Sequence, residues 1–451
     1  MAQHAHRLIW FCSMEDVSAT PEWLAMLRDE IGLTTIMPES HVCHTSGFAA
    51  PPELARRGPF EDWRQRLDRW PRGAQGVYPP VAGTVSGFDD APLLRLVEAC
   101  RGAGIEVWGH MGLWSYGGDV FPEFALVDLW GQPLDPEYKQ WGIGLCPSRP
   151  EINEWTRDCL AAAAARYDVD GFCVDHARYP APASLSALFA CGCDACRAAA
   201  AELGSEAEAA RGAAEGVRDR LRQLGPAGLR QLAAGRPGPL DLASLLDPEG
   251  SLLAWFRARA RLLAHRMAEL RQGLAATRAG LVWGSDVFAP SISLLGGHEY
   301  ASWGRAVDYL TGGSSYGGVV GWATGAVNAA ASWAAALCRL VPGVEEGVAL
   351  ALAYGLFGYA DLSLPERLEK VTPGALPLAS LYEREIARLG ALAGPGMPLY
   401  PPLTTSGDAD LVRSLCRAAV AGGCHGAMLG VDPTDRDRLA LLAAQLQGLR
   451  G

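Results

Sequence analysis

Short apolar runs rich in Val, Ile, Phe and Trp recur along the chain, and each is followed by polar residues or glycine and then by a helical pattern. The runs predict eight strands, at residues 8–12, 34–38, 105–110, 171–175, 281–286, 309–315, 398–404 and 426–431. Between the first two, PEWLAMLRDEIG has apolar residues at helical spacing and stops at Gly32, a common helix end. Eight strands alternating with helices predict parallel pairing with right-handed crossovers. The pattern therefore predicts an α/β fold of the (β/α)8 TIM barrel type.

Two regions do not fit this repeat and are predicted to be helical insertions after strands four and six. Residues 182–250 hold several cysteines and then Ala/Glu/Arg-rich helical sequence, and residues 319–375 are rich in glycine and alanine. Within the second region, GVALALAYG competes with residues 398–404 for the place of strand seven. We interpret residues 1–451 as one TIM-barrel catalytic domain that carries both insertions.

Composition narrows the choice of partners. The 451 residues are 49% hydrophobic and 20% charged, which allows a large buried core. A formal net charge of −11 argues against a nucleic-acid partner, because phosphate binding needs clustered Lys and Arg. The chain shows neither a signal-peptide pattern nor the ~20 uninterrupted apolar residues of a membrane span. We therefore expect a cytoplasmic protein without a membrane partner; the oligomeric state stays open, with a homo-oligomer as one outcome.

Four of the eight runs end in an acidic residue: Glu39, Asp175, Asp286 and Asp432. An acid in this position can simply cap the helix that follows. In a barrel, however, the carboxyl ends of the strands form the mouth where the chemistry takes place. For one acid the two interpretations are about equal, whereas four in the same position favour the barrel mouth.

The stretch VDGFCVDHARYP, residues 169–180, resembles the fourth-strand motif of barrel glycoside hydrolases and their uncharacterised relatives. That motif reads DG-apolar-x-apolar-D-x-x-R-Y/F-P. The upstream GLCPSRPEINEW, the cluster CGCDAC, and the later segments VDYLTGGSSY, PLYPPL and GCHGAMLGVD also resemble segments of these relatives. The resemblance runs from about Cys146 to Asp432, and its motifs identify a superfamily better than a substrate.

The resemblance implies an enzyme that cleaves a glycosidic bond with paired carboxylates, Asp175 as nucleophile and Asp286 as acid/base. Adjacent strands lie ~4.8 Å apart, so two such carboxyls can reach the ~5–5.5 Å that suits a double displacement. Strand five departs from the commonest pattern because it offers Asp where Glu is usual. An alternative for Asp175 is a structural ion pair with Arg178. The reaction requires no cofactor, and the substrate would be a small glycoside or oligosaccharide.

Further residues near the strand ends are candidates for substrate binding, because an aromatic face beside hydrogen-bonding groups suits a sugar ring. The candidates are Glu39, His41, His110, Trp114, Tyr116, His176, Arg178 and Tyr316. Alternatively, His110 is a structural histidine. For Trp283 we expect a structural role, in which the indole covers the hydrophobic core.

Cysteines suggest a metal. Without an export signal, the 12 cysteines are expected to be reduced thiols or metal ligands rather than disulfides. Cys191, Cys193 and Cys196 can present three thiolates close together, and a structural zinc ion would need a fourth ligand such as Cys146.

Two other functions remain open. Glu39, His41, His44 and His110 could hold a catalytic ion, which would make the protein a metal-dependent barrel hydrolase or lyase. The third interpretation is a non-catalytic carbohydrate-binding barrel, in which Asp175 and Asp286 do not face a common cleft.

Overall fold

The fold is taken from a computed structural model. It describes residues 6–12, 22–38, 43–44, 91–114, 118, 121–134, 144–175, 177–185, 187–312, 318–404 and 409–446, with the backbone alone at 43–44 and 91–92.

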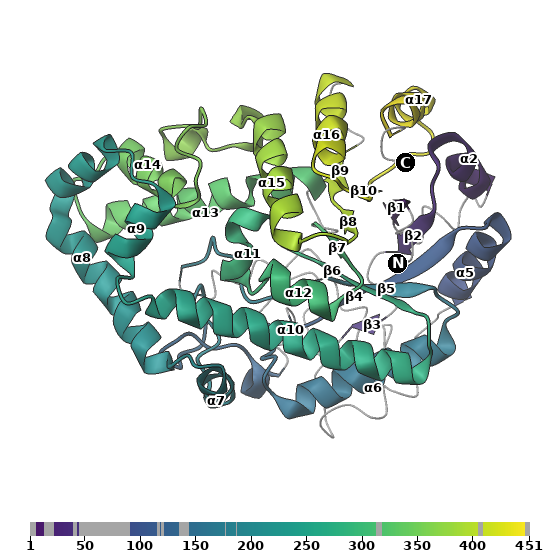
Figure 1. The fold of residues 1–451 in the computed structure, drawn as a ribbon, viewed down its shortest axis with the longest axis horizontal. Coiled ribbons are helices and arrows are strands. Elements are labelled where there is room, and N and C mark those ends of the chain that lie inside the picture. Colours follow the sequence, from purple (N-terminus) through teal and green to yellow (C-terminus); the bar gives the residue numbers. More distant parts are fainter. Residues whose placement is uncertain are drawn as a thin grey trace.

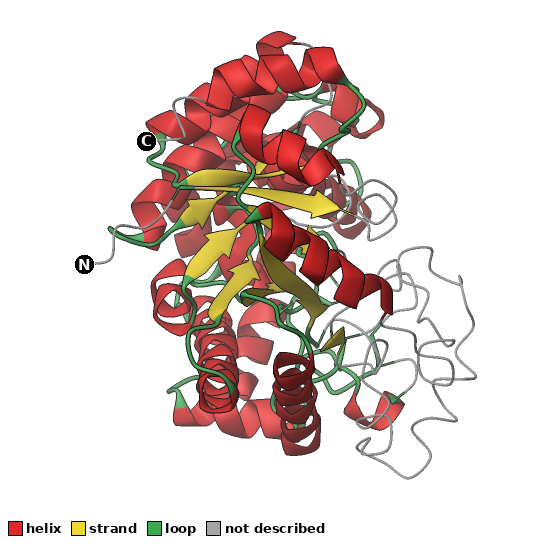
Figure 2. Cartoon of the chain, turned by 90° about the vertical axis from the view of Figure 1, so that its right-hand side faces the viewer, coloured by secondary structure: helices red, strands yellow, loops and turns green. Residues whose placement is uncertain are grey.

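The described strands form one parallel sheet that curls into a nearly closed barrel (Figures 1 and 2). Every pair of neighbouring strands is parallel, in the order β8-β7-β6-β5-β4-β2-β1-β10-β9, with β3 paired to the end of β4. The strands are β1 (Arg7–Cys12), β2 (Thr35–Pro38), β3 (Cys43–His44), β4 (Glu106–Gly112), β5 (Gly171–Asp175), β6 (Val282–Asp286), β7 (Tyr309–Thr311), β8 (Leu399–Tyr400), β9 (Pro402–Leu403) and β10 (Gly426–Leu429).

The barrel closes through a strand that is split in two. β8 pairs with β7 on one side, and β9 pairs with β10 on the other. Only Pro401 separates the two pieces, and its carbonyl accepts a hydrogen bond from the backbone N–H of Met428 (3.0 Å). β8 and β9 therefore act as one strand position, as do β2 and β3, which both pair with β4.

These eight positions coincide with the eight predicted runs, so the predicted TIM-barrel fold is confirmed. Strand seven lies at residues 399–403, within the predicted run 398–404. The competing segment GVALALAYG instead belongs to the helix α14 (Glu346–Leu356). Its apolar residues face other helices, which explains why this segment resembles a buried strand in sequence.

Side chains that point inward fill the barrel. One cluster of buried residues draws on seven of the eight strand positions: Ile9, Met37, Trp108, Cys173, Tyr309, Tyr400 and Met428. The rings of Trp108 and Tyr309 stack across the interior, 4.3 Å between centroids. Gly284 faces the same ring, because a Cβ there would lie 2.0 Å from Cζ of Tyr309. The interior is thus a packed core, as in other barrels of this type.

Helices surround the barrel (Figure 2). Their amphipathic faces pack against the strands, and several end at a glycine with positive φ, as α2 does at Gly32. None of the described helices has the length and apolar character needed to cross a membrane. The helices besides α14 are α2 (Glu22–Ile31), α5 (Ala91–Ala103), α6 (Pro150–Arg166), α7 (Asp194–Glu202), α8 (Ala207–Ala234), α9 (Pro239–Leu246), α10 (Ser251–Thr277), α11 (Pro290–Gly296), α12 (Tyr300–Ala306), α13 (Gly318–Leu340), α15 (Leu378–Ala393), α16 (Ala409–Ala421) and α17 (Arg436–Gln445).

Helices α8, α9 and α14 pack together at one end of the molecule, away from the strands (left in Figure 1). Arg230 on α8 forms an ion pair with Glu345, which caps α14 (2.8 Å). At Gly355 on α14 the backbone comes so close to the start of α9 that a Cβ would lie 2.9 Å from the carbonyl oxygen of Pro237. The two regions predicted to be insertions, 182–250 and 319–375, therefore contribute to a common helical lobe.

Candidate active site

Asp175 and Asp286 end neighbouring strands in the same register. The pairing of β5 with β6 aligns Val174 with Ser285, so the next residues along, Asp175 and Asp286, stand side by side. Because side chains alternate along a strand, each aspartate points to the same side as the inward residue two positions before it. For Asp175 that residue is Cys173, which lies in the barrel interior. Both carboxylates therefore face the mouth of the barrel from its inner wall.

The two aspartates line one cavity of about 270 Å³ at the carboxyl ends of β5 and β6. Among the described residues they are the only carboxylates in its wall. The cavity is mostly apolar with a few polar groups, as small-molecule sites generally are. The wall also includes Arg178, Ala181, Pro182, Ala183, Phe288, His298, Trp322 and Asn328.

His110, on the adjacent strand β4, is a polar neighbour of Asp175. His110 Nε2 lies 3.6 Å from Asp175 Oδ2, and both side chains are almost completely buried. His110 also contacts the ring of Phe11 edge-on, with 5.1 Å between centroids. At this distance the imidazole acts on the carboxylate electrostatically rather than through a short hydrogen bond.

Asp286 has a hydroxyl group beside it from the next strand. The hydroxyl of Thr311 on β7 donates a hydrogen bond to Oδ1 of Asp286. Both side chains are buried, and the register of β6 with β7 places the two residues directly opposite each other. A buried carboxylate is costly unless it is hydrogen-bonded, so this contact both stabilises Asp286 and orients it.

His298 connects the loops that follow the two acidic strands. Its Nδ1 accepts from the backbone N–H of Phe288, two residues after Asp286 (3.0 Å). Its Nε2 therefore carries the proton and donates to the carbonyl of Ala177, two residues after Asp175 (3.1 Å). Burial lowers the pKa of His298 to about 3, so the ring is neutral near pH 7.

Arg178 stands over the cavity wall. Its guanidinium lies 4.9 Å from the centre of the Phe288 ring and donates to the carbonyl of Tyr179 (3.4 Å). Within the described part of the chain, these contacts take the place of the ion pair with Asp175 considered from the sequence. The charge of Arg178 is thus available to the cavity that it lines.

The remaining residues singled out from the sequence either lie away from this cavity or fall outside the described part of the chain. Trp114 is buried away from the cavity, and its indole N–H donates to the side chain of Asn153 (3.2 Å). Trp283 is fully buried in the core between barrel and helices, as expected. Asp432 is exposed, and its carboxylate accepts from the N–H and hydroxyl of Thr434, so it caps a turn. The candidates Glu39, His41, Tyr116, His176 and Tyr316 lie outside the described residues.

Sequence reasoning missed three parts of the site: Thr311, which contacts Asp286, and His298 and one face of α13, which line the cavity. Gly318, Gly321 and Gly325 lie on that face and leave room for the cavity beside Trp322. Their spacing of three and four residues within a helical pattern is a signal that could have revealed this face. No local pattern distinguishes Thr311 or His298, because their partners lie far away in the sequence.

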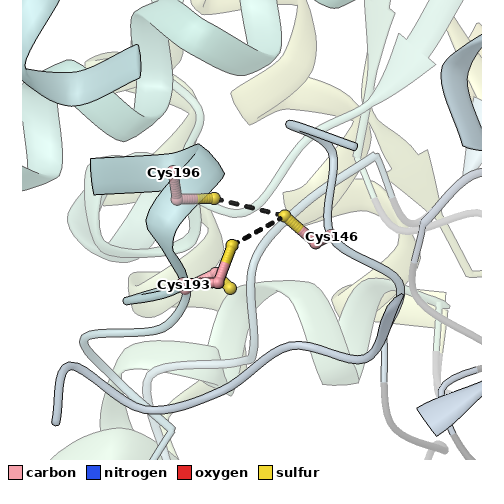
Figure 3. A group of neighbouring side chains, drawn as sticks. Cys146, Cys193 and Cys196 are labelled. Atoms are coloured by element: carbon pink, nitrogen blue, oxygen red, sulfur yellow. Dashed lines mark hydrogen bonds between the residues drawn. The ribbon is translucent and has the colours of Figure 1, made fainter. Parts of the chain in front are cut away.

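A second cluster of reactive side chains lies outside this cavity. Cys146, Cys191, Cys193 and Cys196, here called the four-cysteine cluster, bring their sulfur atoms within 4.8 Å of one another. Sγ of Cys146 lies 3.5 Å from that of Cys193 and 3.3 Å from that of Cys196 (Figure 3). The cluster could hold a metal ion such as zinc, and it includes the fourth ligand that the sequence suggested.

For the metal-dependent alternative the structure gives partial information. Of its four candidate ligands, His110 lies beside Asp175, and His44 is placed only by its backbone in β3. In the described residues, the four-cysteine cluster is the one group of three or more His, Cys, Asp or Glu side chains close enough to share an ion.

No protein-family model and no curated protein matches the sequence. Solved structures similar to this chain include the PgaB (BpsB) glycoside hydrolase domain from Bordetella bronchiseptica, at 10% identity and a TM-score of 0.47, covering 97% of this chain and 98% of that one. A β-galactosidase from the psychrophilic Marinomonas ef1 matches at 11% identity and a TM-score of 0.49, over 98% of this chain and 59% of that one. A GH18 chitinase from Pseudoalteromonas aurantia matches at 8% identity and a TM-score of 0.40, over 99% and 100% of the two chains. At such identities and scores, function has to be argued from this chain's own residues.

Proposed function

We propose that this protein is a glycoside hydrolase that acts by double displacement, with Asp175 as nucleophile and Asp286 as acid/base. The proposal rests on one observation: two buried carboxylates end adjacent strands in register and line the same cavity. Glycosidic cleavage needs two carboxyl groups on either side of one bond. The resemblance of residues 169–180 to the fourth-strand motif of barrel glycoside hydrolases assigns the same role to Asp175.

The reaction proceeds in two steps. The carboxylate of Asp175 attacks the anomeric carbon while the carboxyl group of Asp286 protonates the departing glycosidic oxygen, giving a glycosyl ester on Asp175. Asp286, now ionised, takes a proton from water as the water attacks the same carbon, and Asp175 leaves as carboxylate. The product sugar keeps its anomeric configuration, and both residues return to their starting protonation states.

The environments of the two acids are consistent with this division of work. Asp175 lies beside the imidazole of His110, and Asp286 receives the hydroxyl hydrogen bond of Thr311, so both are held in position. Phe288 and Trp322 give the cavity aromatic surface, while Arg178 and Asn328 supply donors for sugar hydroxyls. These features favour a small glycoside over a charged macromolecule as substrate.

The test separates the two roles with a panel of aryl glycosides. Asp175→Gly should lose turnover of every aryl glycoside by at least ~10³-fold, as loss of a nucleophile does. Added azide should then restore cleavage and yield a glycosyl azide of inverted configuration, because a small anion can attack from the vacated side. Asp286→Ala should keep most of its kcat/KM, which reports the first step, for glycosides with acidic phenols, because these leave without protonation, and should lose it for those with weakly acidic phenols. Its kcat should fall with every substrate, because the second step has lost its base.

Asp432→Asn is the matched control, because that aspartate also follows a barrel strand but is exposed and caps a turn. It should behave as wild type throughout. Full activity of Asp175→Asn on a glycoside that the wild type cleaves would refute the proposal. So would a folded wild-type protein that binds sugars at this cavity yet cleaves none of the panel, which would favour the non-catalytic carbohydrate-binding barrel.

A further inference from the structure

The four-cysteine cluster joins chain segments that are distant in sequence. Cys146 lies just before α6, and its backbone N–H donates to the carbonyl of Phe124 (2.8 Å). Cys193 directly precedes α7, and Cys196 lies within the first turn of that helix (Figure 3). Cys191 lies two residues before Cys193. Gly192 between them packs so tightly that a Cβ would lie 2.3 Å from the carbonyl oxygen of Asp128. The backbone thus brings the four thiols to one point and allows little other arrangement.

The spacing of the sulfur atoms suits a tetrahedral ion. With Zn–S bonds of ~2.3 Å, the edges of a ZnS4 tetrahedron are ~3.8 Å long. The measured separations of 3.3 and 3.5 Å are slightly shorter than these edges, and all four atoms lie within 4.8 Å. The described cysteines are all free thiols, so none of these four is used in a disulfide. A set of four thiolates selects zinc or iron among the common metals.

A buried cation lies beside the cluster. The guanidinium of Arg259 on α10 donates to the carbonyls of Leu188 (2.6 Å) and Leu295 (2.8 Å), and the residue is almost fully buried. No carboxylate of the described residues lies within ion-pair distance of it. Leu188 lies three residues before Cys191, and the guanidinium also stacks on Tyr179 with Cζ 4.3 Å from the ring centre, so it lies against the segment that ends at the cluster. A buried charge needs a partner of opposite sign.

We propose that the four-cysteine cluster binds one structural Zn²⁺ and that Arg259 is its buried counter-charge. Four thiolates and one Zn²⁺ carry a net charge of −2, which accounts for an otherwise unmatched guanidinium. All four ligands come from the protein, so the site has no open position and serves structure rather than catalysis. The proposal is independent of the glycosidase assignment.

The ion would fix one wall of the cavity. The segment from Ala177 to Cys191 contributes Ala181, Pro182 and Ala183 to that wall. The segment is held at three places. His298 donates to the carbonyl of Ala177 at its start, and the indole N–H of Trp333 donates to the carbonyl of Pro182 (2.7 Å). The four-cysteine cluster holds its end at Cys191. Tyr179 lies within this segment and donates its backbone N–H to the carbonyl of Gly296 (2.9 Å). Zinc therefore anchors the far end of this segment, at Cys191, while its near end follows β5.

The first experiment measures metal content by mass spectrometry on untagged, full-length protein purified without added metal. The wild type should contain about one zinc per chain, and titration with a mercurial reagent should release it as the thiols react. Cys193→Ser and Cys196→Ser should each lower zinc content at least severalfold. Cys338→Ser is the matched control, because this half-buried cysteine on α13 lies outside the cluster, and it should retain full zinc.

Substitution of cobalt for zinc adds a readout that does not depend on the stability of a variant. The wild type should show the thiolate charge-transfer bands of tetrahedral cobalt. Arg259→Met should weaken zinc binding by about 10–100-fold in competition with a chelator, as loss of a neighbouring polar partner does. Arg257→Met, an exposed arginine of the same helix, should not change it.

Wild-type protein that is reduced, folded and free of zinc, and that takes up none on addition of Zn²⁺, would overturn the proposal. Zinc that persists at one per chain in the Cys193→Ser and Cys196→Ser variants would also overturn it, because the ion would then lie elsewhere. Iron in place of zinc in the wild type would overturn the choice of metal. Because none of these measurements involves sugar cleavage, their failure is distinguishable from failure of the proposed function.

Discussion

Nε2 of His110 lies 3.6 Å from Oδ2 of Asp175, with both side chains enclosed in the barrel. The pair links one layer of the barrel interior to the next, because His110 is in register with Cys173 and Asp175 is two residues further along β5. His110 was considered either a substrate-binding or a structural residue from the sequence. Because it lies beside the carboxylate, we propose that His110 positions Asp175 for the proposed reaction.

We expect His110→Leu to lower kcat about 10- to 100-fold with little change in KM, because loss of one charged or polar partner of a buried carboxylate costs ~1.5–3 kcal/mol. Steady-state kinetics on an aryl glycoside would measure both constants. Phe11→Leu is the control, since it changes the packing of His110 but not its polar contact. An equal loss in both variants would indicate that only packing matters.

The hydroxyl of Thr311 should matter in a similar way for Asp286. Thr311→Val keeps the shape of the side chain but removes the donor to Oδ1 of Asp286, so kcat should fall about tenfold or more. Thr311→Ser keeps the hydroxyl group and should remain within a few-fold of the wild type. Kinetics with aryl glycosides of weakly acidic phenols would show the largest difference, because those substrates depend most on protonation by Asp286. Equal activity of the Val and Ser variants would contradict this role.

The neutral state of His298 should make the protein less stable in acid. Its pKa in the folded state is about 3, below its usual value of 6.5, so the unfolded chain binds a proton that the folded chain does not. The free energy of unfolding should therefore fall as the pH drops from about 6.5 towards 3, by up to ~1.4 kcal/mol per pH unit from this group.

Urea unfolding between pH 4 and 7.5 would measure this dependence in the wild type and in His298→Asn. The variant should be less stable at pH 7, because it loses contacts to Ala177 and Phe288, but its pH dependence should be shallower. His265→Asn is the control for loss of an imidazole elsewhere, since that histidine is exposed on α10 and the buried contacts of His298 stay intact. A slope in His298→Asn as steep as in the wild type would contradict the prediction.

Gly284 should tolerate no side chain. A Cβ at this position would lie 2.0 Å from the Tyr309 ring, whose hydroxyl donates to the carbonyl of Phe172 (3.2 Å). Gly284→Ala should therefore destabilise the protein by at least ~1–3 kcal/mol, the usual cost of overpacking a core. Gly212→Ala is the matched control on α8, where a Cβ meets nothing within 4 Å, and it should be neutral or stabilising by ~1 kcal/mol. Urea unfolding of both variants would provide the comparison.

The barrel could be predicted from the sequence because strands and helices leave different periodic signals, and eight alternations leave few topologies. Even the weak seventh strand, interrupted by proline, was found by its place in the repeat. The pairing of Asp175 with Asp286 followed from the same argument, since acids that end adjacent parallel strands meet at one edge of the sheet. The spacing of Cys191, Cys193 and Cys196 likewise indicated a cluster, for which Cys146 was suggested as a fourth ligand.

Other parts of the site depend on contacts that the sequence does not reveal. Trp114 follows strand three as an active-site aromatic residue would, but its side chain turns towards Asn153 on α6. Asp432 follows the eighth predicted run directly, as an acid at the barrel mouth would, but the strand ends at Leu429 and Asp432 serves a turn. In both cases the local sequence pattern fits a site residue and a structural residue equally well. The packing of segments distant in sequence decides which of the two roles the residue has.

The shared packing of α8, α9 and α14 has a consequence for protein engineering. Leu229 on α8, Leu242 on α9 and Leu350 on α14 are all buried in one continuous core. Removing α14 alone, or α8 and α9 alone, would expose the apolar side chains of the helices that remain and invite aggregation. A shortened version of this protein must therefore lose these three helices together or retain all three, and natural shortening of the chain would face the same constraint.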